Sequence, residues 1–187
     1  MNITSVSVIG GGAWGTALAQ TLAHGGKRVT LWAREDTVID DVNSRHVNRT
    51  FLPGIELEGS IAATGSLAEA AKSDALLMVV PAQHVRSVSQ ELARSIAEGQ
   101  PVAMCAKGIE QASGKLMHDV VAEVLPKAQY AVLSGPSFAS DIARGLPAAL
   151  TLACRNEAIG RRLASELSSR QMRLYWSSAV AGAELGG

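Results

Sequence analysis

The feature that most constrains the fold is a glycine-rich turn near the N-terminus, where Gly10, Gly12 and Gly15 follow the G-x-G-x-x-G spacing. An apolar, β-branched run, residues 3–9, precedes the turn, and an amphipathic helix pattern, residues 13–24, follows it. In such a motif the first glycine allows a sharp bend, the second lets a pyrophosphate approach bare backbone, and the third lets the helix lie close to the sheet. The free amides and positive dipole end of the helix favour phosphate. A glycine cluster alone would also fit a structural turn, but the order strand, turn, helix predicts dinucleotide binding.

The second strand of this unit, residues 28–33, ends beside the side chains that discriminate between cofactors. An NAD-selective site usually has a carboxylate there, which binds the ribose 2′-hydroxyl. Here Ala33 is neutral and Arg34 follows, which is suited to pair with a 2′-phosphate. The pattern therefore favours NADP, while Glu35 and Asp36 keep NAD open and a solvated loop cation remains the alternative for Arg34.

Strand and helix patterns alternate along the rest of the chain. They predict an α/β fold with a doubly wound, Rossmann-like sheet, mostly parallel, with helices on both faces. The further expected strands are residues 61–64, 75–80, 102–105, 130–133, 147–153 and 172–176. The further expected helices begin near residues 36, 67, 85, 114, 138 and 157. The polar residues 43–54 end in a Pro-Gly signal that is typical of a surface loop.

We assign residues 1–176 to the NAD(P)-binding domain and residues 177–187 to the start of a further domain. The second segment is rich in small residues and glycine. Separated from its domain it would have little to pack against, so we expect it to be mobile or artificially packed.

Two predicted strands deliver candidate site residues to the carboxyl edge of the sheet, where ligands bind in this class of fold. Lys107 directly follows the strand at 102–105 and precedes Gly108, although most lysines are solvated surface charges. Ser137 follows a Gly-Pro turn after the strand at 130–133. It is either the N-cap of the next helix or part of a site in which helix amides hold a polar ligand.

Composition excludes several classes of function. Lys plus Arg and Asp plus Glu number 17 each among 187 residues, which argues against a nucleic-acid or anionic-membrane partner. No apolar run of membrane-spanning length and no leader pattern is present, so we expect a cytoplasmic protein. Cys105 and Cys154 lie in apolar runs and are expected to be buried thiols. The four histidines show no ligand spacing, so no metal is predicted.

Five motifs in this order resemble the bacterial type of NAD(P)-dependent glycerol-3-phosphate dehydrogenase. They are GGGAWGTAL at 10–18, NRTFLPG at 48–54, VPAQ at 80–83, AKGIE at 106–110 and LSGPSFA at 133–139. The resemblance implies reversible reduction of dihydroxyacetone phosphate to sn-glycerol 3-phosphate, a phospholipid precursor. The residue roles that it implies are cofactor contacts at Ala13, Trp14, Arg34 and Ala139, substrate contacts at Gly135 and Ser137, and contact with both at Lys107.

In this family an Ala-Leu-Lys-Asn segment, whose lysine transfers the proton, would follow Gly187, and an all-helical domain would supply an Arg-Asn clamp for the substrate phosphate. We therefore expect the 187-residue chain to bind NADPH and to turn over negligibly, with Lys107 contributing electrostatic stabilisation. A homodimer of the full-length protein is one candidate assembly. The alternatives are another two-domain dehydrogenase, acting on 3-hydroxy acids or ketopantoate, and a non-catalytic nicotinamide-binding module.

Overall fold

The computed structural model describes residues 2–186. Its framework is an eight-stranded sheet in the order β10-β9-β8-β7-β6-β1-β2-β5, in which only the β8–β9 pair is antiparallel. The strands of this sheet are β1 (Ser5–Ile9), β2 (Arg28–Trp32), β5 (Ile61–Thr64), β6 (Ala75–Met78), β7 (Pro101–Met104), β8 (Gln129–Ser134), β9 (Ala148–Ala153) and β10 (Met172–Ser177). The predicted doubly wound, mostly parallel sheet is confirmed.

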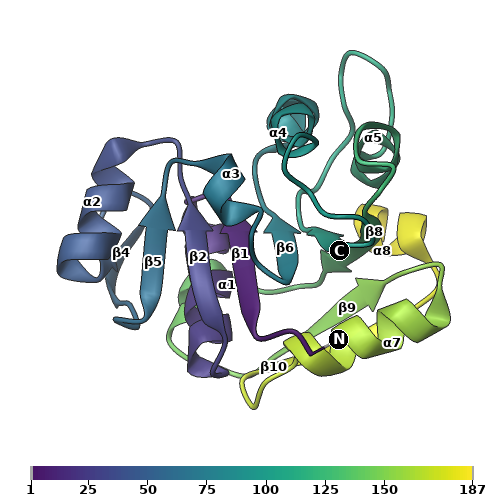
Figure 1. Ribbon diagram of the computed structural model, residues 1–187. Coiled ribbons are helices and arrows are strands. Elements are labelled where there is room, and N and C mark those ends of the chain that lie inside the picture. Colours follow the sequence, from purple (N-terminus) through teal and green to yellow (C-terminus); the bar gives the residue numbers. More distant parts are fainter. Residues whose placement is uncertain (1, 187) are drawn as a thin grey trace.

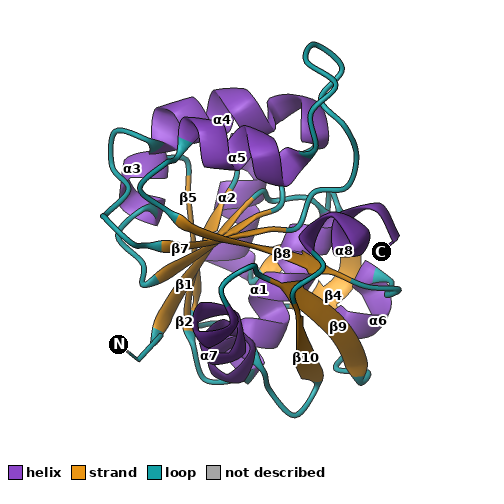
Figure 2. Ribbon diagram, turned by 90° about the vertical axis from the view of Figure 1, so that its right-hand side faces the viewer, coloured by secondary structure: helices purple, strands orange, loops and turns teal. Residues whose placement is uncertain are grey.

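Helices cover both faces of the sheet, with α3, α4 and α5 on one face and α1 and α7 on the other (Figure 2). The helices are α1 (Ala13–His24), α2 (Asp36–Arg45), α3 (Leu67–Ala70), α4 (Val85–Leu92), α5 (Met117–Val124), α6 (Ala139–Ala143), α7 (Glu157–Leu167) and α8 (Val180–Gly186), with a 3-10 turn η1 (Ala82–His84) before α4. Figure 1 shows the same sheet and helices coloured by their order in the sequence.

The central strands are buried on both faces, as a parallel sheet between two helical layers requires. In β6 every residue is buried, and alternate side chains enter different cores: Leu77 packs on the α1 face, and Leu76 and Met78 pack on the α4 face. The chain runs from β1 outward to β2 and β5, and then returns to place β6 on the other side of β1. This reversal creates a crevice at the carboxyl ends of β1 and β6, where ligands bind in doubly wound folds.

The segment predicted as a surface loop, residues 43–54, is instead structured. It completes α2 and then forms a two-stranded antiparallel hairpin from β3 (Val47–Asn48) and β4 (Leu52–Glu56). The prediction was wrong because Asn48, a polar residue, is fully buried against the glycine turn. The polar side chain of Asn48 therefore makes hydrogen bonds inside the protein and not with solvent.

Helix boundaries follow local capping where the capping side chain is present. Ser66 Oγ accepts from Glu69 N at 3.2 Å and Asn156 Oδ1 accepts from Ile159 N at 3.1 Å, and these two caps begin the helices predicted near residues 67 and 157. The Glu69 carboxylate binds Thr64 Oγ1, so the capping box is only half formed. Helix α5 begins at Met117, later than the predicted Gly114, because Gly114 adopts φ 69° in the preceding turn.

Most of the C-terminal tail, for which we expect mobility or artificial packing, is packed against the sheet in the structure. Residues 180–186 form α8, which lies beside β8 and β9. Its Glu184 is 4% exposed, accepts a hydrogen bond from Met117 N at 2.5 Å and pairs with His118 Nδ1 at 2.5 Å. The tail thus has a specific polar partner in α5.

Within residues 2–186, no helix is both long enough and apolar enough to cross a membrane. Cys105 and Cys154 are free and buried, as predicted. Burial raises the pKa of both thiols, which keeps them protonated and unreactive at neutral pH.

Candidate functional site

The glycine turn joins the carboxyl end of β1 to the start of α1. Gly10 has φ 137°, a conformation that favours glycine, and a Cβ there would lie 3.0 Å from the Val79 carbonyl carbon. A Cβ on Gly15 would lie 1.8 Å from the Gly10 carbonyl oxygen. These two glycines therefore allow the sharp bend and the close helix packing that the motif predicts.

Gly12 has a different environment, because a Cβ there would meet no atom within 4 Å. It is the N-cap of α1, and the first intrahelical bond runs from Thr16 N to Gly12 O at 2.9 Å. The amides of the first helical turn consequently have no partner within the helix. The first turn also carries no acidic residue. Open space in front of free amides fits a diphosphate group at this turn.

Asn48 braces the turn from the β3–β4 hairpin. Its Nδ2 donates to Gly11 O and to Thr16 Oγ1, both at 2.8 Å, and its Oδ1 accepts from Phe51 N at 3.1 Å. The side chain is fully buried. A buried amide with three satisfied bonds holds the turn rigidly, because any displacement would leave polar groups unpaired. Reasoning from the residues alone did not identify this brace.

The turn opens into a cleft of about 400 Å³. The cleft contains six of the predicted cofactor residues, namely Gly10, Gly12, Ala13, Trp14, Gly15 and Arg34. Ten further residues complete it: Gly11, Trp32, Glu35, Phe51, Val79, Val80, Pro81, His84, Ser87 and Val88. The sequence indicated Glu35 as a determinant of NAD use, whereas Gly11, Phe51, Val80 and Pro81 lie in the motifs GGGAWGTAL, NRTFLPG and VPAQ without an assigned role. Among them Phe51 is an exposed large hydrophobic residue, a signal of binding that becomes visible only when the exposure is known.

Arg34 lies at the rim of the cleft. Its side chain is 73% exposed, and its only ion pair among residues 2–186 is with its neighbour Glu35, at 3.6 Å. Such an exposed contact is weak, so it leaves the guanidinium available to an anion. Glu35 also lines the cleft, so a cation and a carboxylate stand together where β2 ends.

Lys107 follows β7 at the carboxyl edge of the sheet, as predicted, but it does not line the cleft around the glycine turn. Its side chain is exposed and makes no ion pair within the described part of the chain. Gly108, with φ 122°, bends the chain directly after it. The ammonium group is therefore free to meet a ligand from the solvent side.

Ser137 does not cap the helix that follows it. The N-cap of α6 is Phe138, and Ser137 Oγ is buried without a hydrogen-bond partner among residues 2–186. The capping prediction was wrong because the helix begins one residue later than that interpretation requires. An unpartnered buried hydroxyl is costly, and a polar ligand at this site would satisfy it.

Gly135 and Ala139 flank Ser137. A Cβ on Gly135 would lie 2.7 Å from Leu150 Cδ2, so glycine allows β8 and β9 to approach closely at this turn. Ala139 begins α6, which packs beside α1. Neither residue lines the cleft around the glycine turn.

A second, more open hollow of about 580 Å³ lies at the other end of α1. It is lined by Gln20, His24, residues 54–59, Ala143 and Arg144. It contains none of the predicted site residues. No group of three or more His, Cys, Asp and Glu side chains within residues 2–186 could hold a metal ion.

Comparison with known proteins identifies relatives of the whole chain. A family model described as "NAD-dependent glycerol-3-phosphate dehydrogenase N-terminus" matches residues 5–160. Among curated proteins, the glycerol-3-phosphate dehydrogenase [NAD(P)+] of Parvibaculum lavamentivorans is 57% identical, with 97% of this chain and 55% of the relative aligned. That of Caulobacter vibrioides is 51% identical, with 100% of this chain and 56% of the relative aligned. The chain spans about half the length of these relatives.

Solved structures share the fold. A crystal structure of glycerol-3-phosphate dehydrogenase from Coxiella burnetii superposes with a TM-score of 0.89 at 32% identity, covering 97% of this chain and 56% of that one. A ketopantoate reductase from Ralstonia eutropha superposes with a TM-score of 0.72 at 19% identity, covering 96% and 58%. At that lower identity the likeness concerns the fold alone.

Proposed function

Since this chain belongs to the family of NAD-dependent glycerol-3-phosphate dehydrogenases, whose N-terminal part it matches, we propose that it provides the cofactor site of such an enzyme. The reaction is the interconversion of dihydroxyacetone phosphate and sn-glycerol 3-phosphate with NAD(P)H. The observation that carries the proposal is the open space over Gly12 at the N-terminus of α1, inside a cleft that six predicted cofactor residues line. We also propose that the protein works in the cytoplasm.

The residues of this chain divide the binding of the cofactor among them. The amides of the first turn of α1 would hold the diphosphate. Arg34 would pair with the 2′-phosphate of NADP, and this cation is why we favour NADP over NAD. Glu35 beside it keeps NAD as a possible second cofactor. The bound cofactor supplies the hydride for the ketone.

We propose that the substrate binds to the loops that follow β7 and β8 at the carboxyl edge of the sheet. Negative charge grows on the carbonyl oxygen during reduction, and the free ammonium of Lys107 would stabilise it. The unpartnered hydroxyl of Ser137 and the turn at Gly135 would contact the substrate. We propose that full turnover requires a proton-transferring lysine and a phosphate clamp from the part of the relatives that this chain does not span.

Cofactor titration tests the proposal. Trp14 and Trp32 line the cleft, so NADPH binding should quench tryptophan fluorescence. We expect Arg34→Ala to weaken NADPH binding roughly tenfold or more, because a charge-assisted pair contributes about 1.5–3 kcal/mol. NADH binding should change little.

The matched control is Arg28→Ala, which removes an exposed arginine at the opposite end of the same strand. It should leave both affinities unchanged. Failure of the chain to bind either cofactor, or equal weakening by both variants, would contradict the assigned site.

A further inference from the structure

The loop that carries Lys107 has little regular structure of its own. It runs from the end of β7 at Met104 to the start of α5 at Met117, and within it Ile109 and Leu116 form an isolated antiparallel bridge. Residues 107–109 are exposed. A loop of this kind is ordinarily mobile, so holding Lys107 in one place requires contacts from elsewhere.

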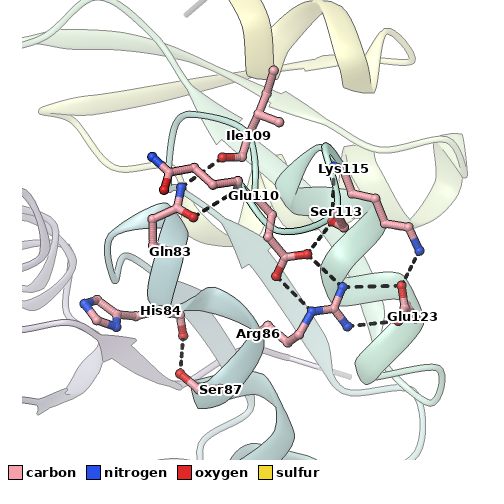
Figure 3. Close-up of polar contacts among 10 residues, drawn as sticks. Gln83, His84, Arg86, Ser87, Ile109, Glu110, Ser113, Lys115 and Glu123 are labelled. Atoms are coloured by element: carbon pink, nitrogen blue, oxygen red, sulfur yellow. Dashed lines mark hydrogen bonds and ion pairs between the residues drawn. The ribbon is translucent and has the colours of Figure 1, made fainter.

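Gln83 supplies the first of these contacts from the turn that precedes α4. Its Nε2 donates to Ile109 O at 2.9 Å, and its Oε1 accepts from Gln111 N at 3.0 Å (Figure 3). One side-chain amide thus binds the backbone on both sides of Glu110, much as a neighbouring strand would. These two bonds restrain the chain two to four residues after Lys107.

Arg86 supplies the second contact, one turn further along. Its Nε donates to Glu110 Oε1 at 2.8 Å and its Nη2 donates to Oε2 at 2.9 Å, a bidentate pair (Figure 3). The Glu110 side chain is 8% exposed, and it also accepts a hydrogen bond from Ser113. A planar bidentate pair fixes orientation as well as distance.

Arg86 is itself held by α5. Its Nη1 lies 2.9 Å from Glu123 Oε1, and Glu123 also binds Lys115 Nζ at 2.5 Å. The guanidinium is therefore fixed from two sides, by Glu110 in the loop and by Glu123 on the helix. These neighbours lower the pKa of Glu110 and bring the pKa of Glu123 down to about 2, so both carboxylates are charged at neutral pH.

The segment that makes these contacts also forms a wall of the cofactor cleft. Pro81, His84, Ser87 and Val88 line the cleft, and in Figure 3 His84 points away from the side on which Gln83 and Arg86 contact the loop. One face of residues 81–88 thus meets the cleft and another holds the loop. The contacts of this segment therefore fix the Lys107 loop relative to the wall of the cleft.

We infer that Gln83 and Arg86 are positioning residues, which hold the Lys107 loop in register with the cofactor cleft so that the ammonium meets the substrate carbonyl. The inference rests on the proposed function. Loosening this clamp, defined as Gln83 and Arg86 with Glu110, should displace Lys107 and leave the glycine turn and Arg34 intact. Misplacement of a catalytic group by about 1 Å can cost roughly a hundredfold in rate.

The test compares Gln83→Met and Arg86→Met with two controls. Both variants keep an aliphatic stem and lose the contacts to the loop. Arg161→Met and Glu157→Gln each remove one partner of an exposed arginine–glutamate pair of 2.7 Å on α7, remote from the loop. Gln83 is exposed, so its variant should fold even if the Arg86 variant does not.

Hydrogen exchange of the loop amides in the 187-residue chain gives the first measurement. The amides of residues 106–111 should exchange roughly tenfold faster in both clamp variants than in the unaltered chain. Their exchange rates should be unchanged in both controls. NADPH affinity should change less than about threefold, since the glycine turn lies outside the clamp. Unchanged exchange in a folded Gln83 variant would overturn the inference.

Kinetics in a protein that joins this chain to the C-terminal part of its relatives gives the second measurement. We expect kcat/KM for dihydroxyacetone phosphate to fall roughly tenfold to a hundredfold with KM for NADPH unchanged, and Arg86→Lys to recover part of the loss. Equal losses for both substrates would indicate a general structural defect and overturn the inference. Absence of NADPH binding in the unchanged chain would instead refute the proposed function.

Discussion

Two glycines of the same turn, Gly12 and Gly15, have opposite surroundings, and substitution should separate binding from stability. Gly12→Val places its side chain in open space before the free amides of α1, so we expect an unchanged unfolding midpoint and at least a roughly tenfold loss of NADPH affinity. Gly15→Ala forces a Cβ to 1.8 Å from Gly10 O, so we expect a loss of stability of about 1–3 kcal/mol. Urea unfolding and fluorescence titration measure the two effects. NADPH binding by Gly12→Val at the unaltered affinity would place the diphosphate elsewhere.

Substitution of Asn48 tests whether its hydrogen bonds to the glycine turn support stability and cofactor binding. Asn48→Ala leaves Gly11 O and Phe51 N without their partner, so we expect a loss of about 1–3 kcal/mol in the free energy of unfolding and weaker NADPH binding. The control is Asn43→Ala, which removes two hydrogen bonds to Ala63 at an exposed site away from the turn. Equal effects of the two variants on cofactor affinity would show that Asn48 has no special role there.

At the scale of elements, the docking of α8 on α5 depends on one buried carboxylate. Glu184→Leu removes the acceptor for Met117 N, at the start of α5, and the partner of His118 Nδ1. The two buried groups left behind should cost about 3 kcal/mol in the free energy of unfolding. Glu157→Leu breaks an exposed pair with Arg161 and should cost less than about 1 kcal/mol. Chemical denaturation compares them, and similar costs would mean that α8 contributes little to stability.

At the scale of the whole molecule, two carboxylates should govern acid stability: Asp74, which joins segments 69 and 70 residues apart, and Asp41, which pairs with arginines four and eight residues later. Asp74 accepts bonds from the backbone of Thr4 and Ser5, which lowers its pKa to about 2, and Arg49 and Arg45 lower the pKa of Asp41 to about 2. A carboxyl whose folded pKa lies below its ordinary value of 3.8 stabilises the protein above that value, and this contribution is lost as the pH falls towards 2. We therefore expect the urea midpoint to fall between about pH 4 and pH 2.

Asp74→Asn isolates one of these contributions. The variant should be less stable than the unaltered chain at neutral pH, and the difference should shrink as the pH approaches about 2. Urea midpoints measured across this range check the expectation. A difference that stays constant with pH would show that hydrogen bonding alone, and not the charge of Asp74, ties β1 to the loop before β6.

The sequence by itself determined the architecture and the nucleotide turn, because their signals are local. Apolar runs mark the buried strands β1 and β6, glycine spacing marks the turn, and Ser66 and Asn156 mark helix starts within three residues of the amides that they cap. The Lys107 position at the sheet edge also follows from its place after a strand.

The tertiary structure alone decided the roles that depend on distant partners. From its local sequence Asn48 is a polar loop residue, and its hydrogen bonds to Gly11 and Thr16 appear only in the tertiary structure. Likewise, only the tertiary structure shows that Glu184 in the tail binds the start of α5. The clamp on the Lys107 loop comes from residues more than twenty positions earlier. Hydrophobic periodicity reports which face of an element is buried, but not which polar groups from remote segments meet there, so these contacts could not be predicted from the pattern.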